Sequence, residues 1–172
     1  MSKKANIGVE IERKYIIAMP DIDILSCQPE YTRSEITQIY IKSAPGETHR
    51  VRRRAYSDRV CFYETQKMRL DHISSTEIEG EISPERFDEL ALGMIEGTKP
   101  VVKTRHTFLY VGHTFEIDVY PEWRSTAIME TELRSREERA QMPEFIKILR
   151  EVTGEKTYSN ASMASAFPPE II

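Results

Sequence analysis

The sequence predicts an α+β protein in which eight antiparallel strands close into a β-barrel, with flanking helices and a short C-terminal helix. Three observations support this fold class. Segments of alternating apolar and polar residues are joined mostly by short turns, which favours antiparallel neighbours. Two further segments repeat apolar residues at helical spacing, so they need an apolar surface to cover. The charged faces of most strands carry one sign of charge, which is unusual for a sheet face in contact with solvent.

Length and composition set the limits of the interpretation. The chain has 172 residues, 40% hydrophobic and 30% charged, which predicts a single domain over residues 1–172 with a core of its own. A net charge of −4 argues against a general nucleic-acid binder held by phosphate contacts. Cys27 and Cys61 lack metal-like spacing and suit a reducing compartment. With no long apolar run or signal peptide, we expect a cytoplasmic protein without a membrane or nucleic-acid partner.

The first predicted strand, residues 9–15, sets the pattern that the others repeat. Successive side chains of a strand point to opposite faces, so Glu10, Glu12 and Lys14 share one face. Turn-forming residues separate the later strands, as at Gly112-His113. The later strands are predicted at about residues 35–43, 48–55, 60–70, 76–82, 101–111, 114–120 and 126–133.

Three helices are predicted. Ser83 suits an N-cap and Pro84 the first helical position, and the apolar spacing that follows predicts a helix over about residues 84–95. A second helix is predicted at about residues 143–152, and its inward side chains would be Phe145, Ile148, Leu149 and Val152. A short third helix is expected at residues 161–166, with Asn160 as its N-cap.

The same-sign charges decide between an open sheet and a barrel. The runs are Arg50, Arg52 and Arg54; Glu77, Glu79 and Glu81; Lys103 and Arg105; Glu116 and Asp118; and Glu130 and Glu132. Like charges on neighbouring positions destabilise a sheet by about 0.2–1 kcal/mol per pair, which is tolerated where a ligand uses them. An eight-stranded barrel encloses room for one small ligand. A salt-bridged polar interior without a ligand is the alternative.

The residue types in these runs suggest a metal–polyphosphate site. Basic side chains from several strands suit a polyanion, and carboxylates from others suit hard divalent cations. Since the four histidines and two cysteines are scattered, Mg²⁺ or Mn²⁺ is favoured over zinc.

Nine short elements, in this order along the chain, resemble the motifs of the CYTH superfamily, also called the triphosphate tunnel metalloenzymes. They are Glu10-Ile-Glu12-Arg-Lys14, Gln38-Ile-Tyr40, Arg50-Val-Arg52, Thr65-Gln-Lys67, Glu77-Ile-Glu79, Lys103-Thr-Arg105, Phe115-Glu116-Ile-Asp118, Glu130-Thr-Glu132 and Tyr158-Ser-Asn160. The resemblance implies an eight-stranded antiparallel tunnel that binds a triphosphate with one or two divalent metals.

The resemblance also implies roles for individual residues. Lys103 would donate a proton to the leaving phosphate with Tyr40 as its partner, and Glu12 would act beside them. The triphosphate would be bound by Lys14, Arg50, Arg52, Lys67, Lys103, Arg105 and Lys156. Metal would be held by Glu10, Glu12, Asp118, Glu130 and Glu132. Supporting roles fall to Glu77, Glu79, Glu116 and Arg54. Thr157 departs from the family pattern, which often has arginine there, and Lys156 is the candidate to compensate.

The sequence therefore predicts a divalent-metal-dependent hydrolase of a triphosphate-bearing small molecule, with inorganic triphosphate as the leading substrate. Three alternatives stay open: an adenylate cyclase of the class IV type, a thiamine triphosphatase, and a non-catalytic module that binds polyphosphate or nucleotide. A homodimer is also left open.

Overall fold

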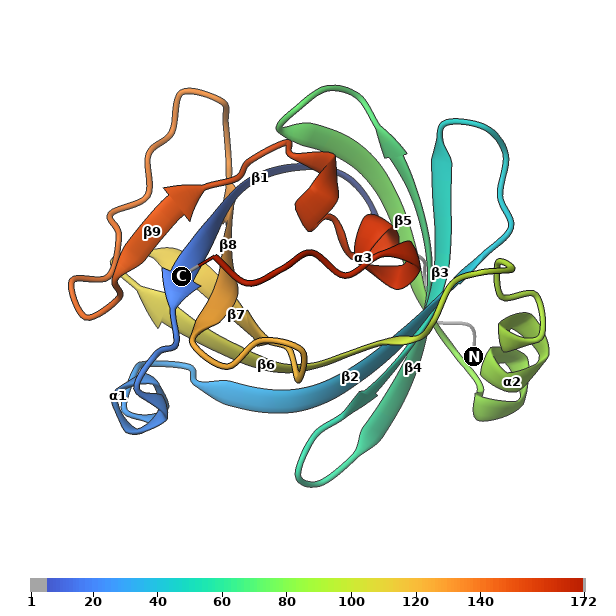
Figure 1. Ribbon diagram of the computed structural model, residues 1–172, viewed down its shortest axis with the longest axis horizontal. Helices are drawn as coiled ribbons and strands as arrows, with labels where there is room; N and C mark the ends of the chain where they lie inside the picture. Colours follow the sequence, from blue (N-terminus) through green and yellow to red (C-terminus); the bar gives the residue numbers. More distant parts are fainter. Residues whose placement is uncertain (1–5, 172) are drawn as a thin grey trace.

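The computed structural model describes residues 6–171, which form nine strands, three α-helices and one 3₁₀ helix (Figure 1). The strands are β1 (Asn6–Ala18), β2 (Thr32–Ile41), β3 (Glu47–Ala55), β4 (Val60–Arg69), β5 (Ser74–Ile82), β6 (Val101–Tyr110), β7 (His113–Val119), β8 (Thr126–Leu133) and β9 (Ile148–Glu151). The helices are α1 (Ile22–Ser26), α2 (Pro84–Ala91), η1 (Lys156–Tyr158) and α3 (Asn160–Ser165).

Eight of the strands form a closed antiparallel ring, which confirms the predicted fold class. The order is β5-β4-β3-β2-β6-β7-β8-β1, and β1 pairs again with β5 to close the ring. The length of β1 allows this closure: residues 6–11 pair with β5, and residues 11–18 pair with β8. In the view of Figure 1, the segment from β9 to α3 runs over the opening of the ring.

The prediction of a helix over residues 143–152 is wrong. The chain there forms the short strand β9, which pairs with β1 at Tyr15–Ile17. Beyond residue 11, β1 has lost β5 as a neighbour, and unpaired backbone groups on a strand edge need partners. β9 supplies them and leaves Ile148 and Leu149 37% and 39% exposed instead of facing inward. The need of β1 for a backbone partner overrides the helical spacing.

The other two predicted helices form, with corrected ends. Ser83 caps α2 by accepting a hydrogen bond from the Arg86 N–H at 3.1 Å, as expected. α2 ends at Ala91 because the chain beyond it returns to β2, where the Ile95 N–H donates to the Tyr40 carbonyl at 3.0 Å.

The expected N-cap of the last helix is also corrected. Ser159, not Asn160, caps α3, since its hydroxyl oxygen accepts from the Ser162 N–H at 3.2 Å. No helix within residues 6–171 is both long and apolar enough to cross a membrane.

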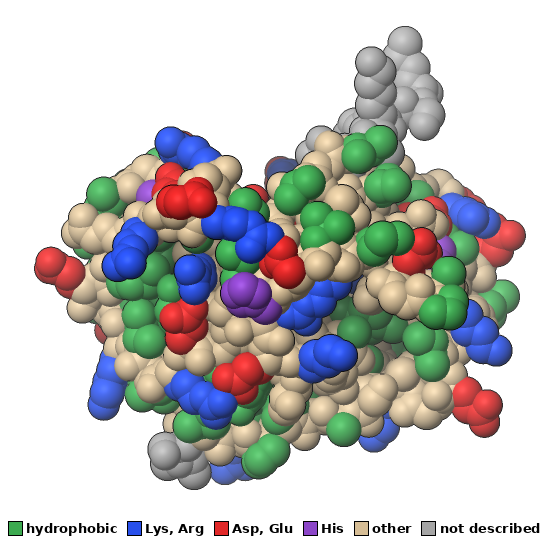
Figure 2. Space-filling view, turned by 90° about the horizontal axis from the view of Figure 1, so that it is seen from above, with side chains coloured by type: hydrophobic (Ala, Val, Ile, Leu, Met, Phe, Trp, Pro, Cys, Tyr) green, Lys and Arg blue, Asp and Glu red, His purple; other side chains and the backbone are tan. Residues whose placement is uncertain are grey.

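The apolar core lies mostly outside the ring, so the interior is free for polar side chains. One cluster packs on the outer faces of β6, β7 and β8, and includes Leu25, Phe108, Phe115, Ile117 and Met129. A second lies where α3 meets the ring, and includes Tyr40, Tyr120, Trp123, Tyr158 and Met163. A third lies beneath α2, and consists of Ile41, Val51 and Phe87. On the face drawn in Figure 2, charges of both signs are mixed, unlike the same-sign runs on the strands.

Candidate functional site

A cavity of about 800 Å³ lies inside the ring. It is lined by inward faces of the strands, by the loop between β4 and β5, and by residues of the segment from β9 to α3. The structure brings fifteen of the predicted site residues to this cavity. They are Glu10, Glu12, Lys14, Tyr40, Arg50, Arg52, Arg54, Lys67, Glu77, Glu79, Arg105, Glu116, Glu130, Glu132 and Lys156. The strand alternation therefore places most of the same-sign charges around one space, while Glu81, Lys103 and Asp118 do not line it.

Arg50 and Arg52 of β3 form a basic wall on one side of this cavity. The Arg52 guanidinium donates to Glu79 at 2.7 Å, while that of Arg50 lies 4.0 Å from the nearest oxygens of Glu77 and Glu79. Within the described residues, the buried Nε groups of both arginines have no hydrogen-bond partner. Burial and the neighbouring Arg50 lower the pKa of Arg52. Both arginines thus keep hydrogen-bonding capacity for an anion.

Lys67 continues the basic wall on β4. Its ammonium lies 3.0 Å from a Glu10 oxygen and 3.5 Å from a Glu77 oxygen. Burial lowers the pKa of Lys67, but Glu12 and Glu10 outweigh it and raise the pKa above its ordinary value. Lys67 therefore stays charged and joins the basic wall to the carboxylates of β1.

Two further predicted basic residues reach the cavity with fewer charged partners. Arg54 donates through Nε to the Ser34 hydroxyl at 2.9 Å, and its guanidinium lies 5.0 Å from the centre of the Tyr56 ring. Lys156 lines the cavity from η1 and makes no ion pair with any residue in the range 6–171. Both side chains therefore add positive charge to the lining of the cavity, where an anionic ligand would meet it.

Opposite charges on β1, β6 and β8 meet in close pairs. The Lys14 ammonium lies 2.8 Å from Glu130, and Arg105 lies 3.4 Å from the same carboxylate. Burial raises the pKa of Glu130, but Lys14 and Arg105 more than offset it and bring the pKa to about 2. Arg105 also contacts Glu116. Lys14, Arg105 and Glu130 are therefore charged, and these opposite charges largely offset one another.

Lys103 and Asp118 do not line the cavity, although both were predicted to act on the ligand. They are 2% and 1% exposed, and the ammonium donates to the carboxylate at 2.5 Å. Arg105 donates to both Asp118 oxygens at 2.7 Å, so the carboxylate is already saturated by two cations. Burial lowers the pKa of Lys103 to about 8, even though Asp118 raises it. The structure thus places this pair behind the wall of the cavity.

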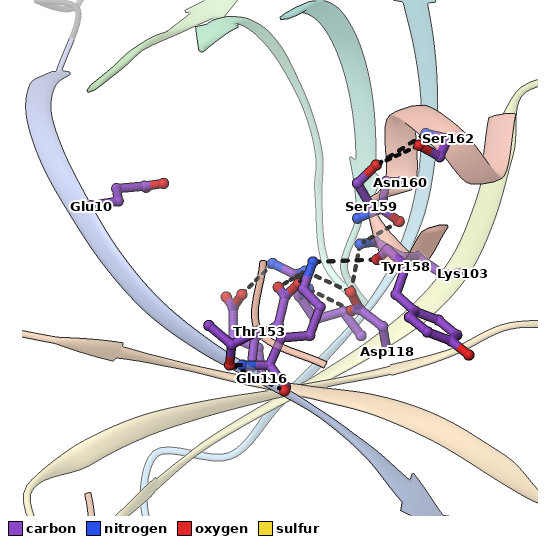
Figure 3. A network of polar contacts seen from close by, with 12 residues as sticks. Glu10, Lys103, Glu116, Asp118, Thr153, Tyr158, Ser159, Asn160 and Ser162 are labelled. Carbon is purple, nitrogen blue, oxygen red and sulfur yellow. Dashed lines mark hydrogen bonds and ion pairs between the residues drawn. The ribbon is translucent and has the colours of Figure 1, made fainter. Parts of the chain in front are cut away.

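Asn160 and Tyr120 belong to the site but were not predicted to contact Lys103. The Asn160 side-chain oxygen accepts from the Tyr120 hydroxyl at 2.8 Å. It also accepts from Lys103 at 3.5 Å (Figure 3). Asn160 also lines the cavity, so it stands between Lys103 and the ligand space. The Lys103 ammonium lies 5.8 Å from the centre of the Tyr120 ring. Tyr120 follows Glu116 and Asp118 at a spacing of two, a signal that could have marked it as inward-facing.

Tyr40, the predicted partner of Lys103, makes a different contact. Its hydroxyl oxygen accepts a hydrogen bond from Gln38 at 3.0 Å. Within residues 6–171, no hydrogen bond joins Tyr40 to Lys103. Tyr40 reaches the cavity and Lys103 does not, so the two residues have different access to a ligand.

A cluster of carboxylates on β1 and β8 is the best candidate for holding a metal. Glu12 lies directly opposite Glu132 in the ladder between these strands. Burial raises the pKa of Glu132 to about 7, and the nearby Glu10, Glu116 and Glu12 add to the shift. Within the described range, no three acidic, histidine or cysteine side chains are already arranged as a metal centre. The donor set nevertheless fits a hard divalent cation, which would relieve the repulsion that holds a proton on Glu132.

Comparisons with known proteins bear on the fold. No family model and no curated protein matches the sequence. Among solved structures, the chain is similar to the inorganic triphosphatase NE1496, with 26% identity and a TM-score of 0.58 over 93% of this chain and 97% of that one. The chain has the tunnel fold of the CYTH superfamily.

A second solved structure supports the same fold. The tunnel is also similar to the PH1819 protein from Pyrococcus horikoshii OT3, with 25% identity and a TM-score of 0.55. That match covers 74% of this chain and 80% of the other.

Proposed function

We propose that this protein hydrolyses a triphosphate inside its tunnel, with Mg²⁺ or Mn²⁺ as cofactor and inorganic triphosphate as the leading substrate. The observation that carries the proposal is the presence of two opposite kinds of lining in one cavity. Arg50, Arg52 and Lys67 present cations, while Glu10, Glu12 and Glu132 present carboxylates. A site for an anion alone gains nothing from the carboxylates, whereas a site for a metal-bound polyphosphate uses both.

The basic residues would bind and orient the phosphate chain. The unpartnered Nε groups of Arg50 and Arg52 suit phosphate oxygens, because hydrogen bonds between charged groups are about twice as strong as neutral ones. Tyr40 lines the same cavity and can donate its hydroxyl hydrogen to the ligand. The basic wall thus neutralises negative charge on the transferred phosphoryl group.

The carboxylates of β1 and β8 would hold the metal. Glu10, Glu12, Glu130 and Glu132 line the cavity, and Glu10 lies across the ring from the Lys103 network (Figure 3). When bound, a divalent ion supplies charge neutralisation and lowers the pKa of water for in-line attack. Asp118 was predicted as a further ligand, but it is saturated by Lys103 and Arg105, so its role here is to balance their charge.

A proton donor for the leaving phosphate requires access to the cavity. Lys103 keeps this predicted role only if the Asn160 side chain moves aside, since Asn160 lines the cavity and contacts Lys103. Tyr40 needs no such movement.

The size of the cavity favours a second candidate substrate class. Pockets for organic ligands typically measure about 300–1,000 Å³, and this one measures about 800 Å³. It therefore leaves room for an organic group attached to the phosphates, as in thiamine triphosphate or ATP. The similarity to inorganic triphosphatase NE1496 keeps inorganic triphosphate first.

The test is phosphate release from inorganic triphosphate, ATP and thiamine triphosphate, each with Mg²⁺, with Mn²⁺ and with chelator. Wild type is compared with Glu12→Ala in the cavity and with Glu122→Ala, an exposed position outside it. We expect metal-dependent release that Glu12→Ala abolishes and Glu122→Ala retains. Cyclic AMP and pyrophosphate from ATP would instead indicate a cyclase. Tight binding without turnover of any substrate would leave a binding module.

A further inference from the structure

Gln38 is the residue whose position the proposed function leaves unexplained. It lies on the inner face of β2, two residues before Tyr40, and its side chain is fully buried. Its amide N–H donates to the Tyr40 hydroxyl oxygen at 3.0 Å. The two side chains therefore act as one unit on the wall of the tunnel.

A cation lies beside the same tyrosine on the neighbouring strand. Arg50 lies directly across from Tyr40 in the β2–β3 ladder. Burial lowers the pKa of Arg50, but the Tyr40 hydroxyl, Glu77 and Glu79 raise it above its ordinary value. Because the Gln38 N–H donates to the Tyr40 oxygen, and Arg50 on the neighbouring strand is a donor and not an acceptor, the hydroxyl hydrogen points away from both. Tyr40 lines the cavity, so that direction leads to the ligand space.

The Gln38 amide is not arranged for stability alone. Its side-chain oxygen is buried and has no hydrogen-bond partner among the described residues. An unsatisfied buried acceptor destabilises a protein, and an apolar side chain of similar shape avoids that loss. Such an unsatisfied buried group is typical of functional sites, where local rules of stability are broken.

We propose that Gln38 is a positioning residue that directs the Tyr40 hydroxyl hydrogen into the tunnel, where it donates to a phosphate oxygen of the bound triphosphate. This inference rests on the proposed function, since it needs a triphosphate in the cavity. It assigns the placement of that hydrogen to Gln38, and gives Lys103 no part in it.

The test is a double-mutant cycle with Gln38→Met, Tyr40→Phe and the combined variant. Thr37→Val is the matched control, because Thr37 neighbours Gln38 on β2 but points to the opposite face. For each protein, kcat, KM, triphosphate affinity by calorimetry and the melting temperature are measured. We expect each single change to lower kcat/KM about tenfold, as for one hydrogen bond to a charged group. The combined variant should be no worse than Tyr40→Phe, because the two residues act through one hydroxyl.

A structural role for Gln38 would give a different pattern. On our proposal, Gln38→Met keeps or raises the melting temperature, and Gln38→Glu impairs activity more, because its carboxylate accepts the phenol hydrogen and turns it from the ligand. Losses that add in the combined variant, or a lower melting temperature with unchanged kcat/KM, would overturn the role of Gln38 alone. A wild type that neither binds nor hydrolyses triphosphate would overturn both this inference and the proposed function.

Discussion

Two walls of the tunnel carry charged residues at alternate positions, but the two walls differ in how far these charges are buried and paired. On β3 and β4, Arg50, Arg52 and Lys67 line the cavity, and the two arginines keep unpartnered Nε groups. On β6 and β7, Lys103 and Asp118 are buried behind the cavity and paired at 2.5 Å. The first wall is open to a ligand, whereas the Lys103–Asp118 pair of the second wall is closed on itself behind the cavity, which Arg105 and Glu116 line. Charge pattern alone therefore locates the inner face, whereas the ion-pair partners and the burial of each charge decide which ones a ligand can reach.

The largest effect on stability is expected for Asp118→Asn on the closed wall. Removing one partner of a buried ion pair leaves an uncompensated charge and destabilises a protein by about 3–5 kcal/mol. Here two buried cations, Lys103 and Arg105, would lose their shared carboxylate. Urea denaturation of the metal-free protein should show this loss.

The matched change on the open wall is Glu79→Gln, which weakens contacts to Arg52 and Thr65. Because this site is partly open to solvent, we expect a loss of about 1–2 kcal/mol. Equal losses for Glu79→Gln and Asp118→Asn would contradict the distinction between the walls.

The second test asks whether the open wall binds the anion. Arg50→Met should weaken triphosphate binding about 10–100-fold, the range for one hydrogen bond between charged groups. Arg53→Met is the control, because Arg53 lies on the same strand but on the exposed face. Titration calorimetry with inorganic triphosphate and Mg²⁺ measures both. Weakening by the Arg53 change as well would show that the effect is general electrostatics, not a contact in the cavity.

The third test uses the carboxylate cluster opposite the open wall. The pKa of Glu132 is raised to about 7, so the folded protein keeps a proton there that the unfolded chain releases near its ordinary pKa of 4.5. Folding stability attributable to this group therefore falls as pH rises from 4.5 to 7. At pH 8 without metal, Glu132→Gln should melt about 2–4 °C higher than wild type, a modest effect because Glu132 is only partly buried and solvent screens its charge.

The difference in melting temperature between wild type and Glu132→Gln should depend on both pH and metal. Below pH 4.5 the melting temperatures of wild type and Glu132→Gln should converge, since the carboxyl is protonated in both folded and unfolded chains. Mg²⁺ should stabilise wild type more than the variant, because binding to the folded state adds stability. Thermal melts across pH, with Glu122→Gln as control, measure this. A variant that gains as much from Mg²⁺ as wild type would remove Glu132 from the metal site.

The sequence was sufficient to predict which strand faces point into the ring, because side chains alternate strictly along a strand. Runs of same-sign charge destabilise a sheet face that has no ligand to bind. The sequence could not predict that Lys103 is buried while Arg105 on the same face lines the cavity. That difference comes from Asn160 and Tyr120, which are distant in sequence. Nor could local spacing show that residues 148–151 form a strand, because the reason lies in the unpaired edge of β1.

The smallest expected effect tests the boundary between the closed wall and the cavity. Asn160→Ala removes the acceptor of the buried Tyr120 hydroxyl, which should lower the free energy of unfolding by about 1–2 kcal/mol. In the combined variant with Tyr120→Phe, the hydroxyl is absent, so Asn160→Ala should lower the free energy of unfolding by less than it does in wild type. Urea denaturation of the four proteins measures this coupling. Strict additivity would mean that Asn160 stabilises α3 rather than the closed wall, and the boundary between the two walls would then lie elsewhere.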